Sequence, residues 1–214
     1  MASTINQTTA LLALARMMGK RTLPNGTNAD WKDYVQTAFD YAWRYYRWGW
    51  SMRSATVDLV NDPYLPADFD LDGYINPLPN SVGAVSYMSL DDWYMNGQYV
   101  NAFSVEWDDS VGRYLVHPGS SLNQATLTLT YQAAPPTLDE TTEVPFPSAQ
   151  TIGIGASIYA KQGENPTRAD ITQEWDEFHK ELNRHVGHSE RSRPQRTNMN
   201  LQDYYGTYTG DTRG

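Results

Sequence analysis

Cysteine is absent from the 214 residues, and histidine is scarce. Without cysteine the chain can form neither a disulfide framework nor a thiolate metal site, which fits a reducing compartment. No HExxH motif accompanies the four histidines, which are His117, His179, His185 and His188. His185 and His188 could share a helix face, but a cation near a helix end serves the helix dipole equally well. These residues therefore predict no metal site of cysteine or histidine, and the sequence predicts no cofactor.

Long hydrophobic runs are also missing. The longest apolar stretch, residues 10–18, is short and is interrupted by Arg16. The start of the sequence lacks the basic segment and the small-residue cleavage site of a secretory signal. We therefore expect no membrane span, and a protein made and kept in the cytoplasm until it is assembled.

Basic residues are almost missing from the middle of the chain. Residues 56–150 contain thirteen Asp and Glu but a single base, Arg113, so this part carries a charge of −12. Residues 1–55 carry +4 and residues 151–214 carry −1, which together give the net charge of −9. A central part that differs so strongly from both ends predicts an inserted domain.

Aromatic residues, in contrast, are abundant, and residues 30–48 (DWKDYVQTAFDYAWRYYRW) are the stretch around which the chain is organised. Asp30 suits an N-cap, Asp33 suits the first turn, and Gly49 suits a C-terminal stop. Apolar side chains recur every three or four residues and form two adjacent ridges on the expected helix. They are Trp31, Val35, Ala38, Ala42 and Tyr45 on the first ridge, and Phe39, Trp43 and Tyr46 on the second.

Three further helices are predicted near the ends of the chain. The first covers residues 4–20, with Ser3 or Thr4 as its cap. The second covers residues 149–162, where small residues make a thin face that another helix could approach closely. The third follows the capping pair Asn165–Pro166 and ends at Gly187, with little structure expected beyond His188.

Between these helices the hydrophobic period changes from about 3.6 to two. Alternation over residues 54–60 predicts a strand. Further strands are predicted at 82–88, 98–107, 114–117 and 126–132, separated by turn signals. Short strands at this spacing favour a small antiparallel sandwich or barrel.

The predicted fold class is therefore α+β, with a helical bundle built from both ends of the chain. Residues 1–53 and 148–187 form the bundle, residues 54–147 form the inserted β-domain, and residues 188–214 form a flexible C-terminal arm.

This layout resembles that of the head–tail adaptor proteins of tailed phages, also called connector or tail tubular A-type proteins. The resemblance covers residues 29–162 and comprises a tryptophan-rich helix, a strand, the segment Leu65–Phe69 (LPADF), a β insertion that closes on LTLTYQAAPPTL, and an Ala/Ile/Tyr helix. It implies a structural protein of the virion, made in the host cytoplasm, that forms a ring of commonly twelve copies. The implied partners are the portal above the ring, a tail or nozzle protein below it, and DNA that passes through without sequence-specific binding.

One acidic segment copies part of a calcium site. Residues 68–76 (DFDLDGYIN) match the first nine positions of an EF-hand loop, with Asp68, Asp70 and Asp72 at positions one, three and five. The twelfth position, which should be a bidentate glutamate, is Pro79. A cation site and a solvated acidic loop both remain open.

No pattern predicts an enzyme. Neither GxSxG nor GK[ST] occurs. Glu106, Asp108 and Asp109 have the chemistry of a glycosidase pair, but acidic residues beside a turn are more often simply solvated.

Two binding surfaces remain as candidates. The β insertion is rich in aromatics, namely Trp93, Tyr94, Tyr99, Trp107 and Tyr114. A flat row of these rings would bind carbohydrate, the alternative function, whereas the competing interpretation is that they fill a core or an interface. The C-terminal arm is either a frayed end or a partner-binding segment anchored by Arg191, Arg193, Arg196, Tyr204, Tyr205 and Tyr208.

Overall fold

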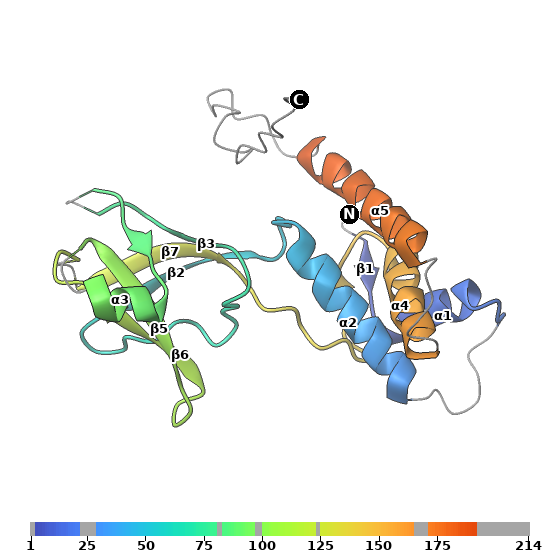
Figure 1. Cartoon of the computed structure of the whole chain (residues 1–214), viewed down its shortest axis with the longest axis horizontal. Coiled ribbons are helices and arrows are strands. Elements are labelled where there is room, and N and C mark those ends of the chain that lie inside the picture. The colour runs from blue at the N-terminus through green and yellow to red at the C-terminus, as the bar shows by residue number, and fades with distance from the viewer. Residues whose placement is uncertain are drawn as a thin grey trace, which may run out of the picture.

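The computed structural model describes residues 3–21, 29–80, 83–96, 100–122, 125–164 and 171–191. Over these residues the protein is α+β, as predicted. Four helices gather at one end of the molecule and two sheets with a short helix gather at the other (Figure 1). None of the described helices is both long and apolar enough to cross a membrane.

The four packed helices come from both ends of the chain. They are α1 (Gln7–Met17), α2 (Ala29–Tyr45), α4 (Ala149–Glu164) and α5 (Ile171–Arg191). Both ridges predicted for α2 are buried or half-buried in one hydrophobic core, against which Trp175 of α5 also packs. The largest fully buried side chains of this core are Ile5, Leu14, Phe39, Trp48, Leu138, Phe146, Ile152, Ile158 and Phe178.

The first helix is shorter than predicted. Thr4–Ile5 forms a strand, β1, which pairs antiparallel with β8 (Val144–Pro145). The helix begins after Asn6, whose side chain accepts a hydrogen bond from the Thr9 amide at 2.9 Å, while the Thr9 hydroxyl accepts from the Asn6 amide at 3.1 Å. This reciprocal pair is a capping box, and it satisfies donors that the first turn leaves free. A cap at Ser3 or Thr4 was therefore the wrong prediction.

The thin face predicted on α4 is confirmed. A Cβ added to Gly153 would lie 2.7 Å from Cβ of Ala13 in α1, and one added to Gly155 would lie 2.6 Å from the ring of Phe178 in α5. Both approaches are too close for any side chain larger than hydrogen. The two glycines therefore allow α1 and α5 to pack directly on α4.

The strands form two three-stranded sheets. One has the order β2 (Met52–Asp58), β7 (Thr126–Gln132), β3 (Ile75–Pro77), and its pairs are antiparallel. The other has the order β4 (Ser86–Tyr87), β5 (Ala102–Asp108), β6 (Arg113–Pro118). The pairing of β4 with β5 is parallel, so the expectation of a purely antiparallel domain was wrong. The sheets share a second hydrophobic core, which includes Val57, Leu65, Phe69, Val85, Phe103, Val105, Val116, Leu122, Leu127, Leu129 and Tyr131.

Two elements of the β region lay outside the predictions. Strand β3 overlaps the end of the acidic EF-hand-like segment, where a loop was expected, and α3 (Leu90–Asn96) is a short helix against β5. Residues 133–147, which were expected to belong to the inserted β-domain, differ from that expectation. Leu138, Val144 and Phe146 contribute to the helical core, so the chain rejoins the helices soon after β7 ends.

Candidate functional site at the junction of α2 and β7

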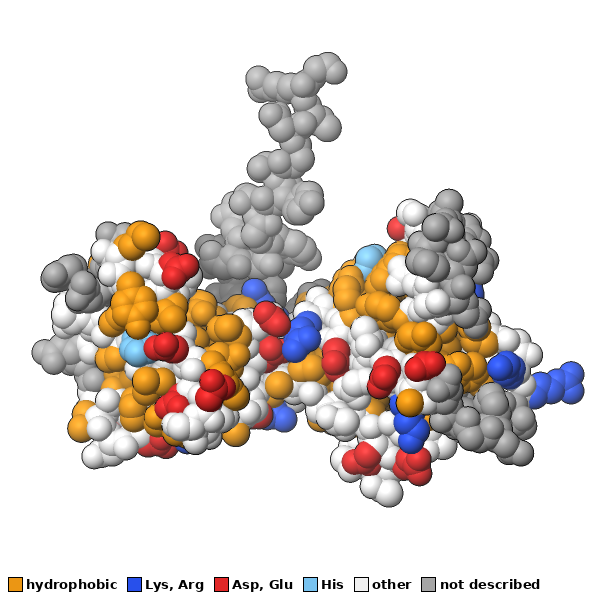
Figure 2. Space-filling model, turned by 60° about the horizontal axis from the view of Figure 1, so that its bottom comes forward, with side chains coloured by type: hydrophobic (Ala, Val, Ile, Leu, Met, Phe, Trp, Pro, Cys, Tyr) orange, Lys and Arg blue, Asp and Glu red, His pale blue; other side chains and the backbone are white. Residues whose placement is uncertain are grey.

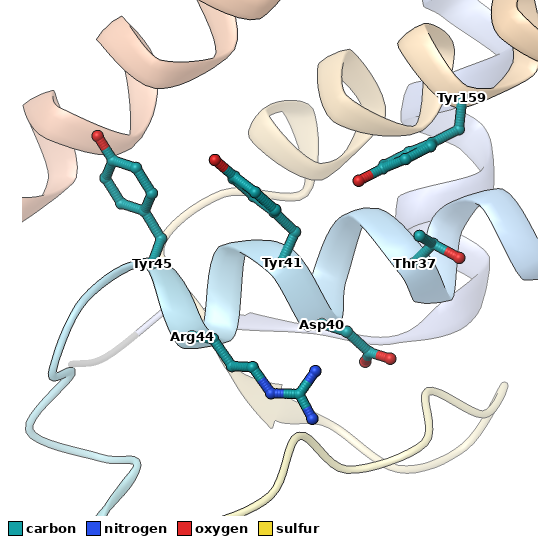
Figure 3. A pocket seen from close by; sticks show the side chains of 6 residues that line it. All are labelled: Thr37, Asp40, Tyr41, Arg44, Tyr45 and Tyr159. Atoms are coloured by element: carbon teal, nitrogen blue, oxygen red, sulfur yellow. The ribbon is translucent and has the colours of Figure 1, made fainter. Parts of the chain in front are cut away.

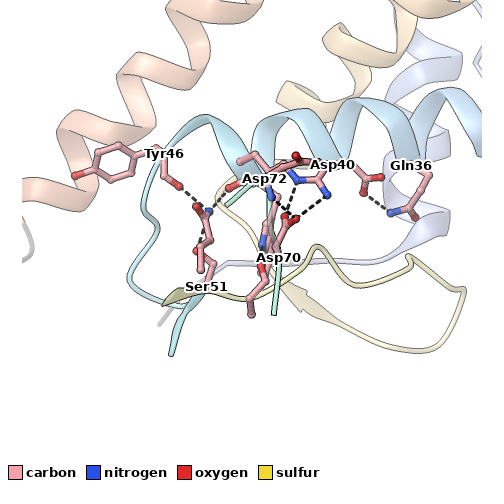
Figure 4. Close-up of polar contacts among 10 residues, drawn as sticks. Gln36, Asp40, Tyr46, Ser51, Asp70 and Asp72 are labelled. Carbon is pink, nitrogen blue, oxygen red and sulfur yellow. Dashed lines mark hydrogen bonds and ion pairs between the residues drawn. The ribbon is translucent and has the colours of Figure 1, made fainter. Parts of the chain in front are cut away.

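The junction of the two cores is built around the C-terminal end of α2. A helix leaves its last carbonyl groups without partners inside the helix, and here other side chains supply them. The indole of Trp48 donates to the Ala42 carbonyl at 2.9 Å. The Gln132 amide, at the end of β7, donates to the Trp43 carbonyl at 2.6 Å and the Tyr46 carbonyl at 3.1 Å (Figure 4). Helix α2 therefore ends at Tyr45, short of the predicted Trp48.

Trp43 ties the same strand to the helix a second time. Its indole nitrogen donates to the carbonyl of Ala133 at 2.7 Å. Ala133 directly follows Gln132, the residue that caps the Trp43 carbonyl. The ring is buried and packs against Phe39 at a centroid distance of 5.5 Å. Gln132 is only 2% exposed, and its amide also lies 3.2 Å from the Ser51 hydroxyl at the start of β2. Both chain crossings between the two cores, at β2 and at β7, are thus fixed to α2.

An ion pair spans the junction next to these contacts. The Arg44 Nε donates to Oδ2 of Asp70 at 2.6 Å, and the second oxygen of that carboxylate accepts from the Asp72 amide at 3.2 Å. Asp70 is only 7% exposed, so its charge depends on this partner. The hydrogen bond to Asp70 raises the pKa of the Arg44 guanidinium.

Asp40 lies one turn before Arg44 on α2. Its Oδ1 accepts from the Gln36 amide at 2.6 Å (Figure 4). Burial raises the pKa of the Asp40 carboxyl above its ordinary value, and the negative charge of Asp70 acts in the same direction. The Gln36 hydrogen bond and the positive charge of Arg44 lower it in part.

Two of the three EF-hand-like carboxylates are engaged by protein groups. Asp70 is paired with Arg44, and Oδ1 of Asp68 accepts from the Tyr131 hydroxyl at 2.7 Å. Burial and this bond to Asp68 raise the pKa of Tyr131 well above its usual range. Within the described residues, no group of three or more His, Asp or Glu side chains is placed to hold a metal ion. The contacts of Asp68 and Asp70 thus belong to the β region and to its junction with α2.

Two open grooves lie beside α2 at this junction. The first, of about 460 Å³, is lined by Thr37, Asp40, Tyr41, Arg44, Tyr45 and Tyr159. The second, of about 420 Å³, is lined by Arg44, Tyr45, Tyr46, Arg47, Asp72, Gly73, Tyr74 and Gln132. Figure 3 shows the rings of Tyr41 and Tyr45 on the side of α2 that faces α4 and α5, with Asp40 and Arg44 on the opposite side.

The groove side chains are held by their neighbours. The Tyr41 hydroxyl lies 2.7 Å from Nε2 of His179, and the Tyr45 hydroxyl donates to Asn183 at 3.1 Å. The Arg47 guanidinium stacks 3.6 Å from the ring centre of Tyr74. Among the described residues, the lining of neither groove includes a histidine, although His179 lies directly behind Tyr41. Aromatic rings with guanidinium groups suit contact with another protein.

The remaining candidate residues are dispersed. Glu106 pairs with His117 at 3.0 Å, Asp108 accepts from the Tyr64 hydroxyl at 2.9 Å, and Asp109 accepts from the Trp107 indole at 2.8 Å. Each of these acids is thus bonded to a different neighbouring side chain.

The predicted C-terminal arm is only partly described. Helix α5 continues to Arg191, four residues past the predicted end at Gly187, so the expectation of little structure beyond His188 was wrong for residues 189–191. Arg193, Arg196, Tyr204, Tyr205 and Tyr208 lie outside the described residues, as does Tyr99 of the aromatic set. Of the two C-terminal histidines, His185 lies 2.9 Å from the Thr151 hydroxyl, and the side chain of His188 is not described.

Comparison with known proteins adds no assignment. No protein-family model and no curated protein matches the chain. The candidate site therefore depends on geometry alone, and the adaptor family stays a prediction from the layout of the sequence.

The contacts of the junction were not predicted from the sequence. Arg44 and Asp70 are 26 residues apart, and Trp43 and Gln132 are 89 apart. A single sequence contains no signal that pairs such distant residues. One clue was present, since Arg44 and Arg47 near the end of the predicted helix are cations that could pair with the three aspartates.

Proposed function

We propose that the protein is a structural head–tail adaptor of a tailed phage, which forms a ring beneath the portal and docks the tail. The observation that supports this is the division of the chain between two cores. Helices from both ends share one core, the strands between them share the other, and α2 joins the two. We interpret the β region as a small sandwich inserted into a helical bundle, the layout that the resemblance implies.

The charge distribution supports a role beside DNA without binding to it. Residues 56–150 contain thirteen acids and a single base, Arg113. The Arg113 guanidinium already donates to the carbonyls of Leu65 and Tyr64 and pairs with Asp62. Proteins that bind DNA neutralise its phosphates with lysine and arginine, and this region offers the opposite charge. Carboxylates on a channel wall would let DNA slide past without adhering.

The junction would make the adaptor subunit rigid. Trp43, Gln132 and the Arg44–Asp70 pair hold the β region in one orientation relative to the helices. A ring subunit that transmits contact from portal to tail needs this rigidity. The C-terminal arm, residues 188–214, would follow α5 onto the portal or a neighbouring subunit and anchor there through its arginines and tyrosines.

The decisive experiment is to measure the mass of the assembled protein. Mass photometry and negative-stain imaging of the full chain, alone and co-expressed with the portal protein of the same virus, should show a ring of uniform size. A ring of twelve would have about twelve times the 24.2 kDa mass of the chain. A monomer or small oligomer under both conditions would overturn the proposal.

The alternative function is a carbohydrate-binding β-module on a helical stalk. It draws support from Trp107 and Tyr94, which are 50% and 57% exposed. However, Trp107 meets Tyr114 at an interplanar angle of 70°, and Trp93 meets Tyr94 at 78°. Rings that meet edge to face form no flat platform for a sugar, and this geometry supports packing instead. Binding to a glycan array that is lost in a Trp107→Ala variant would favour the alternative.

A further inference from the structure

The helical end of the molecule finishes in a group of exposed basic residues. Arg16, Lys20 and Arg21 lie exposed at and just after the end of α1, together with exposed Met17. Figure 2 shows lysine and arginine side chains at this extremity, far from the sheets. We name Arg16, Met17, Lys20 and Arg21 the cationic end. Asp30 and Asp33 occupy the start of α2 nearby, but these two acids do not outweigh the three bases, so the net charge stays positive.

The opposite end of the molecule presents acids among exposed apolar side chains. In the β4–β5–β6 sheet, Phe103 and Val105 point into the core, so Ser104 and Glu106 point outward. Helix α3 lies on this outward side, because its Trp93 packs on His117, the partner of Ser104 across the strands, at 5.3 Å.

Helix α3 leaves its own outward side uncovered. Tyr94 and Met95 are 57% and 75% exposed, and Asp91 and Asp92 are exposed beside them. Together with Glu106 these residues form what we name the outer face. In Figure 2 the β region shows hydrophobic and acidic side chains gathered on one side. Exposed apolar groups collected among charges are typical of a protein–protein contact.

We infer that the cationic end of one copy docks on the outer face of the next copy. The two surfaces are complementary, since three cations meet three carboxylates and Met17 meets Tyr94 and Met95. Charge complementarity of this kind selects the partner and the register of an interface. The inference rests on the proposed ring and names the contact that builds it.

The position of the two surfaces determines the type of assembly. They are different surfaces at different ends of one chain, so the contact is head to tail. A repeated head-to-tail contact closes into a ring when its rotation is a simple fraction of a full turn, and it otherwise makes a filament. A symmetric dimer, in contrast, would require one surface to complement itself.

Charge reversal tests the contact directly. Arg16→Glu/Arg21→Glu reverses the cationic end and leaves Lys20, which stacks on Trp31 at 4.8 Å, in place. Asp91→Lys/Asp92→Lys reverses the outer face. Each variant alone should raise the protein concentration at half-assembly by about tenfold or more, measured by mass photometry and light scattering.

Mixing the two variants gives the sharper result. In an alternating ring, every second contact is the natural one and every other contact has both charges reversed, so the mixture should assemble at nearly the wild-type concentration. Tyr94→Ser/Met95→Ser, which changes no charge, should also weaken assembly. Lys180→Glu/Arg184→Glu, on the exposed side of α5, is the matched control and should assemble normally.

The outcomes separate this contact from the ring itself. The head-to-tail contact would be overturned if each charge-reversed variant assembled at the wild-type concentration. It would also be overturned if two defective variants failed to assemble when mixed. Either result would leave the adaptor function standing. Absence of any ring from the wild type, alone and with the portal, would overturn the proposed function. Denaturation curves of each variant establish that it is folded.

Discussion

Trp43 and Gln132 hold each other across the junction of the two cores. The Gln132 amide caps the Trp43 carbonyl at 2.6 Å, and the Trp43 indole donates to the carbonyl of the next residue, Ala133, at 2.7 Å. The C-terminal ends of α2 and β7 are thereby fixed to each other by two short, buried hydrogen bonds. The Ala42 and Trp43 carbonyls, which the end of a helix would otherwise leave without partners, are thus used to attach the helix to its surroundings.

Replacing Gln132 with leucine should destabilise the protein. The substitution keeps the size of the side chain but removes the donor that Gln132 supplies to the Trp43 carbonyl, and buried groups without partners cost about 1–3 kcal/mol. Urea denaturation followed by tryptophan fluorescence measures the change. Gln150→Leu, at an exposed position in the first turn of α4, is the control and should change the free energy of unfolding little. An equal effect of both substitutions would remove the capping role.

Glycine substitutions should have opposite effects in two helices. At Gly153 a new Cβ would lie 2.8 Å from the backbone of Ala13, so alanine there must force α1 and α4 apart and cost about 1–3 kcal/mol. At Gly187 in α5 nothing lies within 4 Å, so alanine should stabilise the helix by about 0.5–1 kcal/mol. Thermal and chemical denaturation of the two variants give the comparison. Stabilisation by Gly153→Ala would show that the two helices are not in direct contact.

The elements with a strong hydrophobic period could be predicted from the sequence. The ridges of α2, the thin face of α4 and the alternation of β2 and β7 each repeat over several residues, and burial follows that repeat. Even there the end of α2 differed, because the Trp48 indole turns back onto the helix to cap Ala42. No local pattern encodes such a contact.

The short elements and the junction could not be predicted. Strand β1 has two residues and α3 has seven, too few for a period to show. The junction depends on pairs that only the folded chain brings together. Asp70 illustrates the difficulty, because in the sequence it belongs to a metal-like acidic motif and in the structure it neutralises Arg44.

Asp40 should make stability fall as the pH rises. Burial raises its folded pKa, so folding favours the protonated carboxyl. This contribution is fully present below the unfolded pKa, near pH 4, and is lost as the pH rises through the folded pKa. Asp40→Asn removes the charge but keeps an acceptor for Gln36, so its stability relative to the wild type should improve between pH 3 and pH 7. Urea unfolding at several pH values measures this.

The control for Asp40 is Asp33→Asn, which removes an exposed carboxylate from the same helix. It separates the effect of burial from the effect of one fewer negative charge on the whole protein. A stability difference between the Asp40→Asn variant and the wild type that is constant across the pH range would show that Asp40 stays solvated.

Arg44 and Asp70 should be strongly coupled. Arg44→Met leaves a carboxylate that is only 7% exposed without its cation, and this should cost about 2 kcal/mol after allowance for the partial exposure of Arg44. Asp70→Asn added to that variant removes the unpaired charge, so the double variant should lose less stability than the two single losses combined. A coupling of about 1 kcal/mol or more is expected from the double-mutant cycle.

The matched control is the exposed pair Lys32–Glu140, whose nitrogen and oxygen are 3.5 Å apart and whose coupling should be near zero. Strict additivity at Arg44 and Asp70 would mean that the ion pair contributes nothing to the junction, and the orientation of the sheets would then depend on Trp43 and Gln132 alone.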